Sequence, residues 1–467
     1  MTAHRQADRE ASTIAAIATP PGPGGIGIIR ISGGAARDIL ARLFRPACDR
    51  ELLSHRLTYG WIVDPATGRP LDEVMAVLMA APHSYTREDV VEIQSHSSFL
   101  ILQQILSLVF SAGALPAEPG EFTKRAFLNG RLDLTRAEAV IDLLQARTSQ
   151  GLQIAIDQLR GSLREQVEAV RQELLGIRAL LEVAIDFPDD EVEIIRPVDL
   201  LAALAARVIE PLEGLLRAAD RGRIYREGVA VVILGRPNVG KSSLLNSLLR
   251  EERAIVTEIP GTTRDTVEDF LNINGVAVRI VDTAGIREDA EAVEELGIQR
   301  ARRKQQEADL VLLVVDGSAG LQADDLALAA SLAGRPALLV VNKTDLCPDL
   351  DLAAYATALP GLPAVPLSAR TGEGLVRLEE AIFTRVTGGQ GGGEPEHSCV
   401  PNARHRQALQ GALVAVHQLA AALGDNLPPD LAAIEVQAAL AQLGEIVGET
   451  TGEDLLDTIF SRFCLGK

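Results

Sequence analysis

The spacing of apolar residues predicts helices in two separate parts of the chain and short strands between them. From Thr135 to Ile185 apolar residues recur at helical spacing with charged residues between them, and Arg404 to Phe463 has the same character. The stretch in between contains short apolar runs, typical of buried strands, that alternate with helical segments. These runs are Val229 to Leu234, Leu310 to Val315 and Ala337 to Val341.

A hairpin is predicted within this middle stretch. The runs Asp269 to Ile273 and Val276 to Val281 flank Asn274-Gly275, a pair typical of a two-residue hairpin turn. Together these elements predict a doubly wound α/β domain over about Gly228 to Val386, and the glycine-rich Thr387 to Gly393 is typical of a flexible linker. We expect this domain to be inserted into a helical domain, because insertion at an exposed loop with adjacent ends is tolerated.

Residues 1–130 are predicted to form a separate unit that contains β-strands. Gly22 to Gly27 satisfies the pattern GxGxxG, which in dinucleotide-binding proteins opens a helix. Here a β-rich run, Ile28 to Ser32, follows it instead. We therefore interpret the glycines as a turn between two strands.

A phosphate-binding loop is predicted directly after the first strand of the α/β domain. Gly235 to Ser242 reads GRPNVGKS and precedes a helix-like segment, Ser243 to Leu249. Such a loop presents backbone N–H groups at a helix N-terminus, where the helix dipole also favours negative charge. Lys241 is predicted to reach the outer phosphates, and the Ser242 hydroxyl to ligate Mg²⁺.

Four further motifs follow in order along the chain. They are Gly261 to Asp265 (GTTRD), Asp282 to Gly285 (DTAG), Asn342 to Asp345 (NKTD) and Ser368 to Arg370 (SAR). Any one of them alone is typical of a surface turn, but the ordered series predicts a nucleotide site. The Asp345 carboxylate can accept hydrogen bonds from N1–H and the exocyclic amine of guanine, a donor pair that adenine lacks, so the sequence predicts GTP. Asp282 is predicted to sense the metal and γ-phosphate, with Gly285 free to move.

Lysine is rare in this chain, which has five lysines among 45 basic residues. Arginine therefore serves where any positive charge suffices, and each lysine in a motif calls for a reason. Lys241 and Lys343 lie in the phosphate and base motifs, where a compact ammonium suits the site better than a planar guanidinium. The same argument draws attention to Lys467.

Composition and charge restrict the function classes. No apolar run approaches the roughly 20 residues of a membrane helix, and the first ten residues contain no apolar signal core, so we expect a cytoplasmic protein without a membrane partner. Four cysteines, at 48, 347, 399 and 464, show neither CxxC spacing nor clustering with histidine, which favours free thiols. A net charge of −19 argues against binding nucleic acid by bulk electrostatics, so an RNA partner must be met locally or through another protein.

Several stretches of the sequence together resemble one family. They are Thr13 to Pro20, Ser84 to Glu92, Pro119 to Thr123, Arg125 to Gly130, Ala184 to Pro188, the nucleotide motifs and Phe463 to Lys467. Over the whole chain, the sequence resembles the MnmE (TrmE) tRNA-modification GTPases. The resemblance implies a multidomain protein of α/β and α type. Its expected domains are a β-rich α+β folate-binding domain at 1–130, the first segment of a helical domain at 131–227, an inserted Ras-like doubly wound G domain at 228–386, and a linker with the second segment of the helical domain at 387–467.

The resemblance also implies a reaction and partners. Members of the family act with an FAD-dependent protein of the MnmG (GidA) type to add an aminomethyl or carboxymethylaminomethyl group at C5 of the wobble uridine of tRNA. A reduced folate, a tetrahydrofolate derivative, is the implied one-carbon donor, and a homodimer through the N-terminal domain is implied. The alternative is a switch GTPase of the ribosome-assembly type without group transfer. The folate-like N-terminal unit and Cys464 favour the first interpretation.

The chain lacks the glutamine with which Ras-like enzymes orient water, because Ile286 follows the DTAG motif. The resemblance implies that Glu294 takes part in hydrolysis instead. It also implies a K⁺ ion bound by Asn238, Thr257, Ile259 and Thr262, which would stabilise charge that develops in the transition state, and Mg²⁺ bound by Ser242 and Thr263. The complete set of predicted GTP-binding residues is Gly235, Asn238, Val239, Gly240, Lys241, Ser242, Ser243, Thr257, Thr262, Thr263, Asp282, Gly285, Asn342, Lys343, Asp345, Ser368, Ala369 and Arg370.

For folate, the family positions correspond to Arg30, Glu92, Arg131 and Lys467. A glutamate can accept from the pterin amino and ring N–H groups, and cations suit the glutamate tail of a folate. The chain departs from the family at His96-Ser97-Ser98, where His-Gly-Gly is usual and where side chains crowd a close backbone approach.

Cys464 has two interpretations. It is either a thiolate nucleophile near the one-carbon unit or a buried structural thiol, and the resemblance favours the nucleophile.

Overall fold

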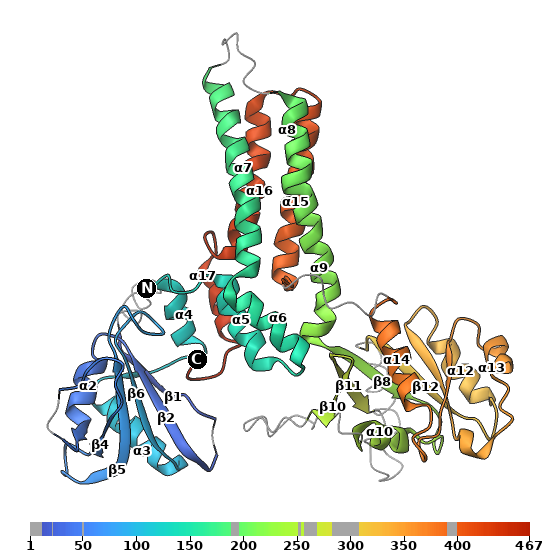
Figure 1. Ribbon diagram of the computed structural model, residues 1–467, viewed down its shortest axis with the longest axis horizontal. Coiled ribbons are helices and arrows are strands. Elements are labelled where there is room, and N and C mark those ends of the chain that lie inside the picture. The colour runs from blue at the N-terminus through green and yellow to red at the C-terminus, as the bar shows by residue number, and fades with distance from the viewer. Residues whose placement is uncertain are drawn as a thin grey trace.

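The computed structural model describes residues 12–20, 22–48, 51–187, 196–250, 254–255, 269–282, 308–389 and 399–467. Within these ranges the chain forms two seven-stranded sheets and a set of long helices (Figure 1). The protein is multidomain and contains both helices and sheets, as the sequence predicts. No helix in the described ranges is both long and apolar enough to cross a membrane.

The first sheet lies near the N-terminus of the chain. Its strands run in the order β3-β4-β5-β6-β2-β1-β7, antiparallel except for the pair β1 and β7. They are β1 (Ile14–Ile17), β2 (Gly24–Ser32), β3 (Phe44–Pro46), β4 (Thr58–Val63), β5 (Pro70–Met79), β6 (Val90–Ser97) and β7 (Leu115–Pro116). Helices α2 (Ala36–Leu43) and α3 (Phe99–Ser111) pack with one face of this sheet into a core that contains Ile29 and Ile31. Alternation along β2 places Arg30 on the opposite face.

The glycine-rich segment Gly22 to Gly27 leads into β2 and does not begin a helix, as the sequence predicts. The chain turns between Ile17 and Gly24, and Gly24 to Gly27 already belong to β2. A Cβ added at Gly27 would lie 2.7 Å from Cδ1 of Leu102 in α3, so glycine here allows the helix to pack closely on the strand.

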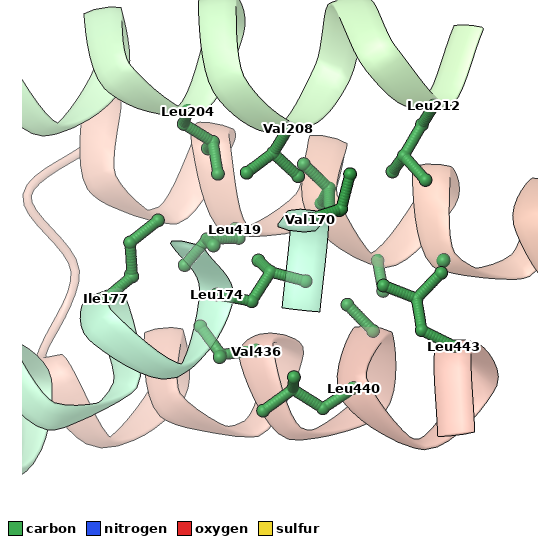
Figure 2. Close-up of a cluster of buried hydrophobic side chains, with 14 of the residues drawn as sticks. Val170, Leu174, Ile177, Leu204, Val208, Leu212, Leu419, Val436, Leu440 and Leu443 are labelled. Carbon is green, nitrogen blue, oxygen red and sulfur yellow. The ribbon is translucent and has the colours of Figure 1, made fainter. Parts of the chain in front are cut away.

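Four long helical segments form a bundle that stands between the two sheets (Figure 1). They are α7 (Ser162–Asp186), the continuous run of α8 (Pro197–Leu204), π-helical η1 (Ala205–Ile209) and α9 (Glu210–Glu227), α15 (Ala403–Gly424) and α16 (Pro429–Val447). In α7, buried apolar residues recur every three or four positions from Leu163 to Leu181, which confirms the predicted helical period. Figure 2 shows side chains such as Leu174, Leu204 and Leu443 pointing toward one another from different helices.

Shorter helices connect the bundle to the first sheet. They are α4 (Glu121–Leu128), α5 (Leu134–Gln145), α6 (Ser149–Arg160) and α17 (Glu453–Phe460). Phe460 of α17 packs with Leu134 of α5 and Phe127 of α4 in one apolar cluster.

A buried polar network joins α5 to the start of α15. Arg404 donates to both carboxylate oxygens of Glu138, at 3.0 and 2.7 Å. His405, which is fully buried, has Nε2 2.7 Å from the same carboxylate. This network lies where the chain re-enters the bundle.

The second sheet lies between α9 and α15 in the sequence. Its strands run in the order β14-β13-β12-β8-β11-β10-β9, and all neighbours are parallel except around β10. They are β8 (Val229–Leu234), β9 (Ala254–Ile255), β10 (Asp269–Ile273), β11 (Val276–Asp282), β12 (Leu310–Asp316), β13 (Ala337–Asn342) and β14 (Ala364–Pro366). Ile273 pairs with Val276 across Asn274-Gly275, which confirms the predicted hairpin.

Helices cover both faces of this sheet. Apolar residues of α10 (Lys241–Arg250) and α14 (Leu375–Val386) pack on one face, and those of α12 (Ala323–Ser331) and α13 (Leu352–Ala358) pack on the other. A short 3₁₀ helix, η2 (Thr344–Leu346), follows β13. Adjacent parallel strands end at the same edge, so the loops after β8, β12 and β13 come together there.

The chain leaves and re-enters the bundle at neighbouring points. Val400 packs so closely on Gly222 of α9 that a Cβ at this glycine would collide with its side chain. Arg406 of α15 also pairs with Asp220 of α9 at 2.7 Å. Adjacent ends of this kind are what an inserted domain requires.

Candidate functional site

The predicted phosphate-binding loop lies between β8 and the first turn of α10. Asn238 and Gly240 adopt positive φ angles of 64° and 97°, while Val239 between them is buried and anchors the loop. A Cβ at Gly235 would collide with the carbonyl oxygen of Val314, and one at Gly240 would collide with Nδ2 of Asn342. Glycine at both positions lets the loop lie directly against β12 and the base motif.

The ammonium of Lys241 is directed by the loop itself. Its Nζ donates to the carbonyl oxygens of Gly235 and Arg236, at 2.8 and 2.7 Å. Ser242 and Ser243 follow in the first turn of α10 and are at least partly exposed. A lysine together with the N–H groups of a helix N-terminus forms an anion site, which suits phosphate.

Asn342 ties the predicted motifs together. Its side chain is 2% exposed, donates from Nδ2 to Val239 O at 2.8 Å, and accepts at Oδ1 from the N–H groups of Lys343 and Ala369, at 2.8 and 3.0 Å. One buried amide therefore joins the phosphate loop, the NKTD motif and the SAR motif.

Lys343 bridges the loop to β12. Its Nζ donates to Asn238 O at 2.9 Å and to Oδ2 of Asp316 at 2.6 Å. Burial alone would raise the pKa of Asp316, but hydrogen bonds from Lys343 and Ser318 hold that pKa below its ordinary value. Sequence reasoning did not select Asp316, although an aspartate that directly follows an apolar run at the carboxyl edge of a parallel sheet was a usable signal.

Asp345 is fixed by two residues of the SAR motif. Ser368 Oγ donates to its Oδ1 at 2.7 Å, and Nη2 of Arg370 lies 3.2 Å from its Oδ2. The Asp345 carboxylate is 13% exposed, whereas Arg370 is 79% exposed. Each carboxylate oxygen keeps a lone pair for a further donor, so the held group can accept the two N–H donors of a guanine.

Part of the predicted nucleotide set lies outside the described residues, namely Thr257, Ile259, Thr262, Thr263, Gly285 and Glu294. Asp282 ends β11, where its backbone lies beside Ile233 of β8. The described metal candidates, Ser242 and Asn238, offer a hydroxyl and an amide oxygen, which are donors that Mg²⁺ and K⁺ accept. Within the described ranges, no three histidine, cysteine or acidic side chains gather into a metal-holding group.

The second candidate site lies on the face of the first sheet opposite α2 and α3. Arg30 of β2 and Glu92 of β6 are register partners, and Nε and Nη2 of Arg30 donate to Oε1 of Glu92 at 3.0 and 2.8 Å. The guanidinium of Arg30 also lies 5.6 Å from the centroid of Tyr85 and 5.7 Å from that of Phe122. Arg131 stacks on the same tyrosine, at 4.7 Å. Phe122 is fully buried, whereas the partly exposed ring of Tyr85 can offer its face to a flat, hydrogen-bonding heterocycle.

The C-terminal segment reaches this site. Nη1 of Arg30 donates to Gly466 O at 3.2 Å. Gly466 has a φ of 88°, and a Cβ there would lie 2.6 Å from Ile17 O, so the segment lies directly on β1. Lys467 is half-buried beside it, and Cys464 is exposed, with its carbonyl oxygen 3.5 Å from Gly120 N. All four cysteines are free thiols.

Ser97 and Ser98, where the family resemblance leads us to expect glycines, lie at the end of β6 and just after it. Ser97 Oγ donates to Gly22 O at 3.1 Å and lies against Gly24. Ser98 precedes α3. His96 is exposed and bonds to Asp72, and that hydrogen bond raises the pKa of His96. The Ser97 side chain thus contacts the strand entry at Gly22 to Gly24.

Comparisons with known proteins cover nearly the whole chain. A model of the MnmE helical domain matches residues 134–464, and a model of the N-terminus of the GTP-binding protein TrmE matches residues 13–131. The tRNA modification GTPase MnmE of Desulfotalea psychrophila is 52% identical over 467 residues, or 99% of each chain. That of Geobacter sulfurreducens is 46% identical and covers 97% of this chain and 99% of its own. Among solved structures, the G domain of the T. maritima FeoB iron transporter is 30% identical over 34% of this chain and 98% of that one, with a TM-score of 0.27.

Proposed function

The chain belongs to the MnmE family, and we propose that it is a GTPase that acts in tRNA modification. The observation that carries the GTP assignment is the fixed carboxylate of Asp345, which Ser368 and Arg370 hold at the edge of the sheet where the phosphate loop also lies. Asn342 connects the two halves of the site, so base recognition and phosphate binding form one unit.

Guanine recognition is tested by changing Asp345 to asparagine. The amide of Asp345→Asn donates a hydrogen bond where the carboxylate accepts one. The variant should therefore bind GTP about tenfold or more weakly and xanthosine triphosphate about tenfold or more tightly than the unmodified chain. Competition against a fluorescent GDP measures both affinities. Asp351→Asn, at the N-cap of α13, is the matched control and should leave the preference unchanged. Equal affinity of the unmodified chain for ATP and GTP would sink the assignment.

GTP hydrolysis is proposed to drive a conformational cycle in a complex with an FAD-dependent protein of the MnmG type. The substrate in this proposal is the C5 position of the wobble uridine of tRNA, and the product carries an aminomethyl or carboxymethylaminomethyl group. Mass spectrometry of tRNA nucleosides from cells that lack this gene tests the proposal. Unchanged wobble uridines would favour a switch GTPase without group transfer.

Mg²⁺ and K⁺ are the proposed metals of the nucleotide site. Ser242 and Thr263 would hold Mg²⁺, and Asn238, Thr257, Ile259 and Thr262 would hold K⁺, which supplies positive charge beside the phosphates. Hydrolysis should therefore be fast in K⁺ and slow in Na⁺, and Glu294→Ala should lower kcat with little effect on nucleotide affinity. Identical rates in the two salts would contradict the K⁺ proposal.

A reduced folate is the proposed ligand of the site around Arg30 and Glu92 on the first sheet. Glu92 would accept from the pterin, and the cations Arg30, Arg131 and Lys467 would bind the folate carboxylates. The described bonds from Arg30 to Glu92 both end on Oε1, so Oε2 faces the ligand in this proposal. Calorimetry should show that a tetrahydrofolate derivative binds and that Glu92→Ala weakens the binding. The absence of heat at saturating folate would contradict it, and Ser97 would then be the first residue to replace.

Cys464 is proposed to act as a nucleophile beside this ligand. The thiol is exposed, which does not fit a buried structural role. Cys464→Ser should leave folding and GTP hydrolysis intact and abolish tRNA modification in cells.

A homodimer through the N-terminal domain is also proposed, and sedimentation of the full chain tests it.

A further inference from the structure

A buried ion pair holds the start of the phosphate loop from outside the nucleotide motifs. Nε of Arg236 donates to Oδ1 of Asp325 at 2.8 Å. The Asp325 side chain is fully buried and that of Arg236 is 25% exposed. Asp325 belongs to α12, which contributes none of the predicted nucleotide residues.

Asp325 is itself held rigidly. Its Oδ2 accepts from the N–H of Gln322 at 3.1 Å, as part of a capping box at the start of α12. Within the described ranges, Arg236 is the only cation paired with it. A buried carboxylate bonded through both oxygens has one position, so the guanidinium that neutralises it is fixed as well.

The peptide of Arg236 is what Lys241 contacts. Nζ of Lys241 donates to the carbonyl oxygens of Arg236 and Gly235. Gly235 is fixed independently, because it lies in close contact with Val314 of β12. Strand β12 therefore positions one of the two carbonyls, and the ion pair with α12 positions the other.

We propose that Asp325 is a positioning residue for phosphate binding, which acts through Arg236 to fix the peptide that directs Lys241 at the outer phosphates of GTP. The inference rests on the proposed GTPase function. The side-chain hydrogen bonds of Asp325 described above go to Arg236 and Gln322, so its effect on Lys241 is transmitted by the backbone of the loop. The lysine of such a loop reaches the β- and γ-phosphates, whereas Asp345 reads the base. Loss of the pair should therefore weaken GTP and GDP binding and spare GMP.

Two single variants of the full chain test this prediction. Asp325→Asn and Arg236→Gln should each weaken GTP and GDP about tenfold, equivalent to about 1.4 kcal/mol, in competition with a fluorescent GDP. GMP affinity should stay within about twofold. Because both changes break the same ion pair, the double variant should lose no more GTP affinity than the single variant that binds GTP less tightly. Arg236→Lys keeps the charge and should bind GTP within about threefold of the unmodified chain.

The controls separate positioning from folding. Arg223 and Asp309 form another ion pair, at 3.5 Å, away from the loop, and Arg223→Gln should leave all three affinities unchanged. Arg236→Gln strands a buried charge, so Asp325→Asn, which strands none, carries the test if the former does not fold. Unchanged GTP affinity in Asp325→Asn, or equal losses for GTP and GMP, would overturn the inference. Equal ATP and GTP affinity in the unmodified chain would instead count against the proposed function.

Discussion

Gly240 sets how closely the phosphate loop approaches the base motif. Its φ is 97°, and a Cβ there would collide with Nδ2 of Asn342, the atom that bonds to Val239 O. Gly240 is therefore required for two reasons, backbone conformation and contact with a buried amide.

Gly240→Ala should reduce GDP affinity by at least about tenfold, because the positive φ alone costs about 1–3 kcal/mol and the methyl group displaces Asn342. Calorimetry with GDP measures the loss. Gly361→Ala is the matched control, since Gly361 has a φ of 90° and open space around it. Equal effects of the two variants would show that the contact with Asn342 is unimportant.

The contributions of His405 and Asp142 to the stability of the fold change with pH in opposite directions. Nδ1 of His405 accepts from Asn402 N at 3.1 Å, so the proton lies on Nε2, facing Glu138, and burial lowers the pKa of His405. The Glu138 carboxylate opposes this lowering, whereas the charges of Arg404 and Arg226 add to it. Burial raises the pKa of Asp142 to about 6, although Arg226 opposes the rise.

The direction of each change in stability depends on whether the folded or the unfolded state binds protons more readily. In the unfolded state, His405 takes up a proton below its ordinary pKa of about 6.5, whereas in the folded state burial disfavours that proton. The contribution of neutral His405 to stability is therefore present above about pH 6.5 and is lost below it. In the folded state, Asp142 takes up a proton below about pH 6. The buried Asp142 carboxylate therefore destabilises the fold above pH 6, and this destabilisation disappears as the pH falls toward about 4.

Asp142→Asn should therefore slow hydrogen exchange of the α5 amides at pH 8 and have little effect at pH 5. His405→Gln should speed their exchange most at pH 8, with a smaller difference at pH 5, where the unmodified protein has already lost the contribution of His405. Exchange read by mass spectrometry over residues 134–145 measures both. The same shift for the two variants at each pH would contradict the assigned pKa directions.

At the scale of elements, the β10–β11 hairpin contacts the α5–α6 connection and the start of α6. The guanidinium of Arg147, just after α5, lies 3.3 Å from the ring centroid of Phe270 in β10. At the turn, Gly275 lies so close to Gln150 of α6 that any side chain there would collide with it. The hairpin also connects the segments that carry GTTRD and DTAG, so it is placed to relate them to the helices.

Arg147→Ala should loosen this contact, because a cation over an aromatic face contributes about 0.5–2 kcal/mol. Hydrogen exchange of β10 and β11 should rise by about three- to tenfold at equal pH. Arg160→Ala, at the exposed end of α6, serves as the control and should leave the hairpin unchanged. No change in the hairpin after Arg147→Ala would mean that Gln150 and its neighbours hold it.

The sequence predicts these elements well because their signals are local. Apolar residues every three or four positions mark α7, and Asn274-Gly275 marks the hairpin turn, each within a few residues. The pairs that build the sites are not local. Arg236 and Asp325 are 89 positions apart, and nothing in either neighbourhood indicates the other. The family resemblance identifies Arg30 and Glu92, but their pairing depends on strand register, which single-residue patterns do not encode.

For the whole molecule, the bundle is the common support of both candidate sites. Helix α9 ends directly at β8, which leads into the loop that carries Lys241, and α17 packs against α4 beside the first sheet. The segment after α17 then lies on β1 and bonds to Arg30. The two sheets are therefore connected through packed helices as well as through the chain.

Removal of residues 465–467 should weaken reduced-folate binding at least about fivefold and leave GTP affinity unchanged. The change deletes the carbonyl that Arg30 contacts and lies far from the second sheet along the chain. Calorimetry with each ligand measures the two affinities. A parallel loss of GTP binding would show that the deletion disturbs the bundle rather than the first sheet.

The bond between Arg30 and Gly466 also has a consequence for how the protein is made. Its partners are 436 positions apart, so at about 5–20 residues per second the ribosome adds the second one roughly 20–90 s after the first. The first sheet can fold during that time, but its site is not complete until residue 466 has emerged. A chain whose translation stops early can therefore carry every GTP motif and still lack a finished N-terminal site.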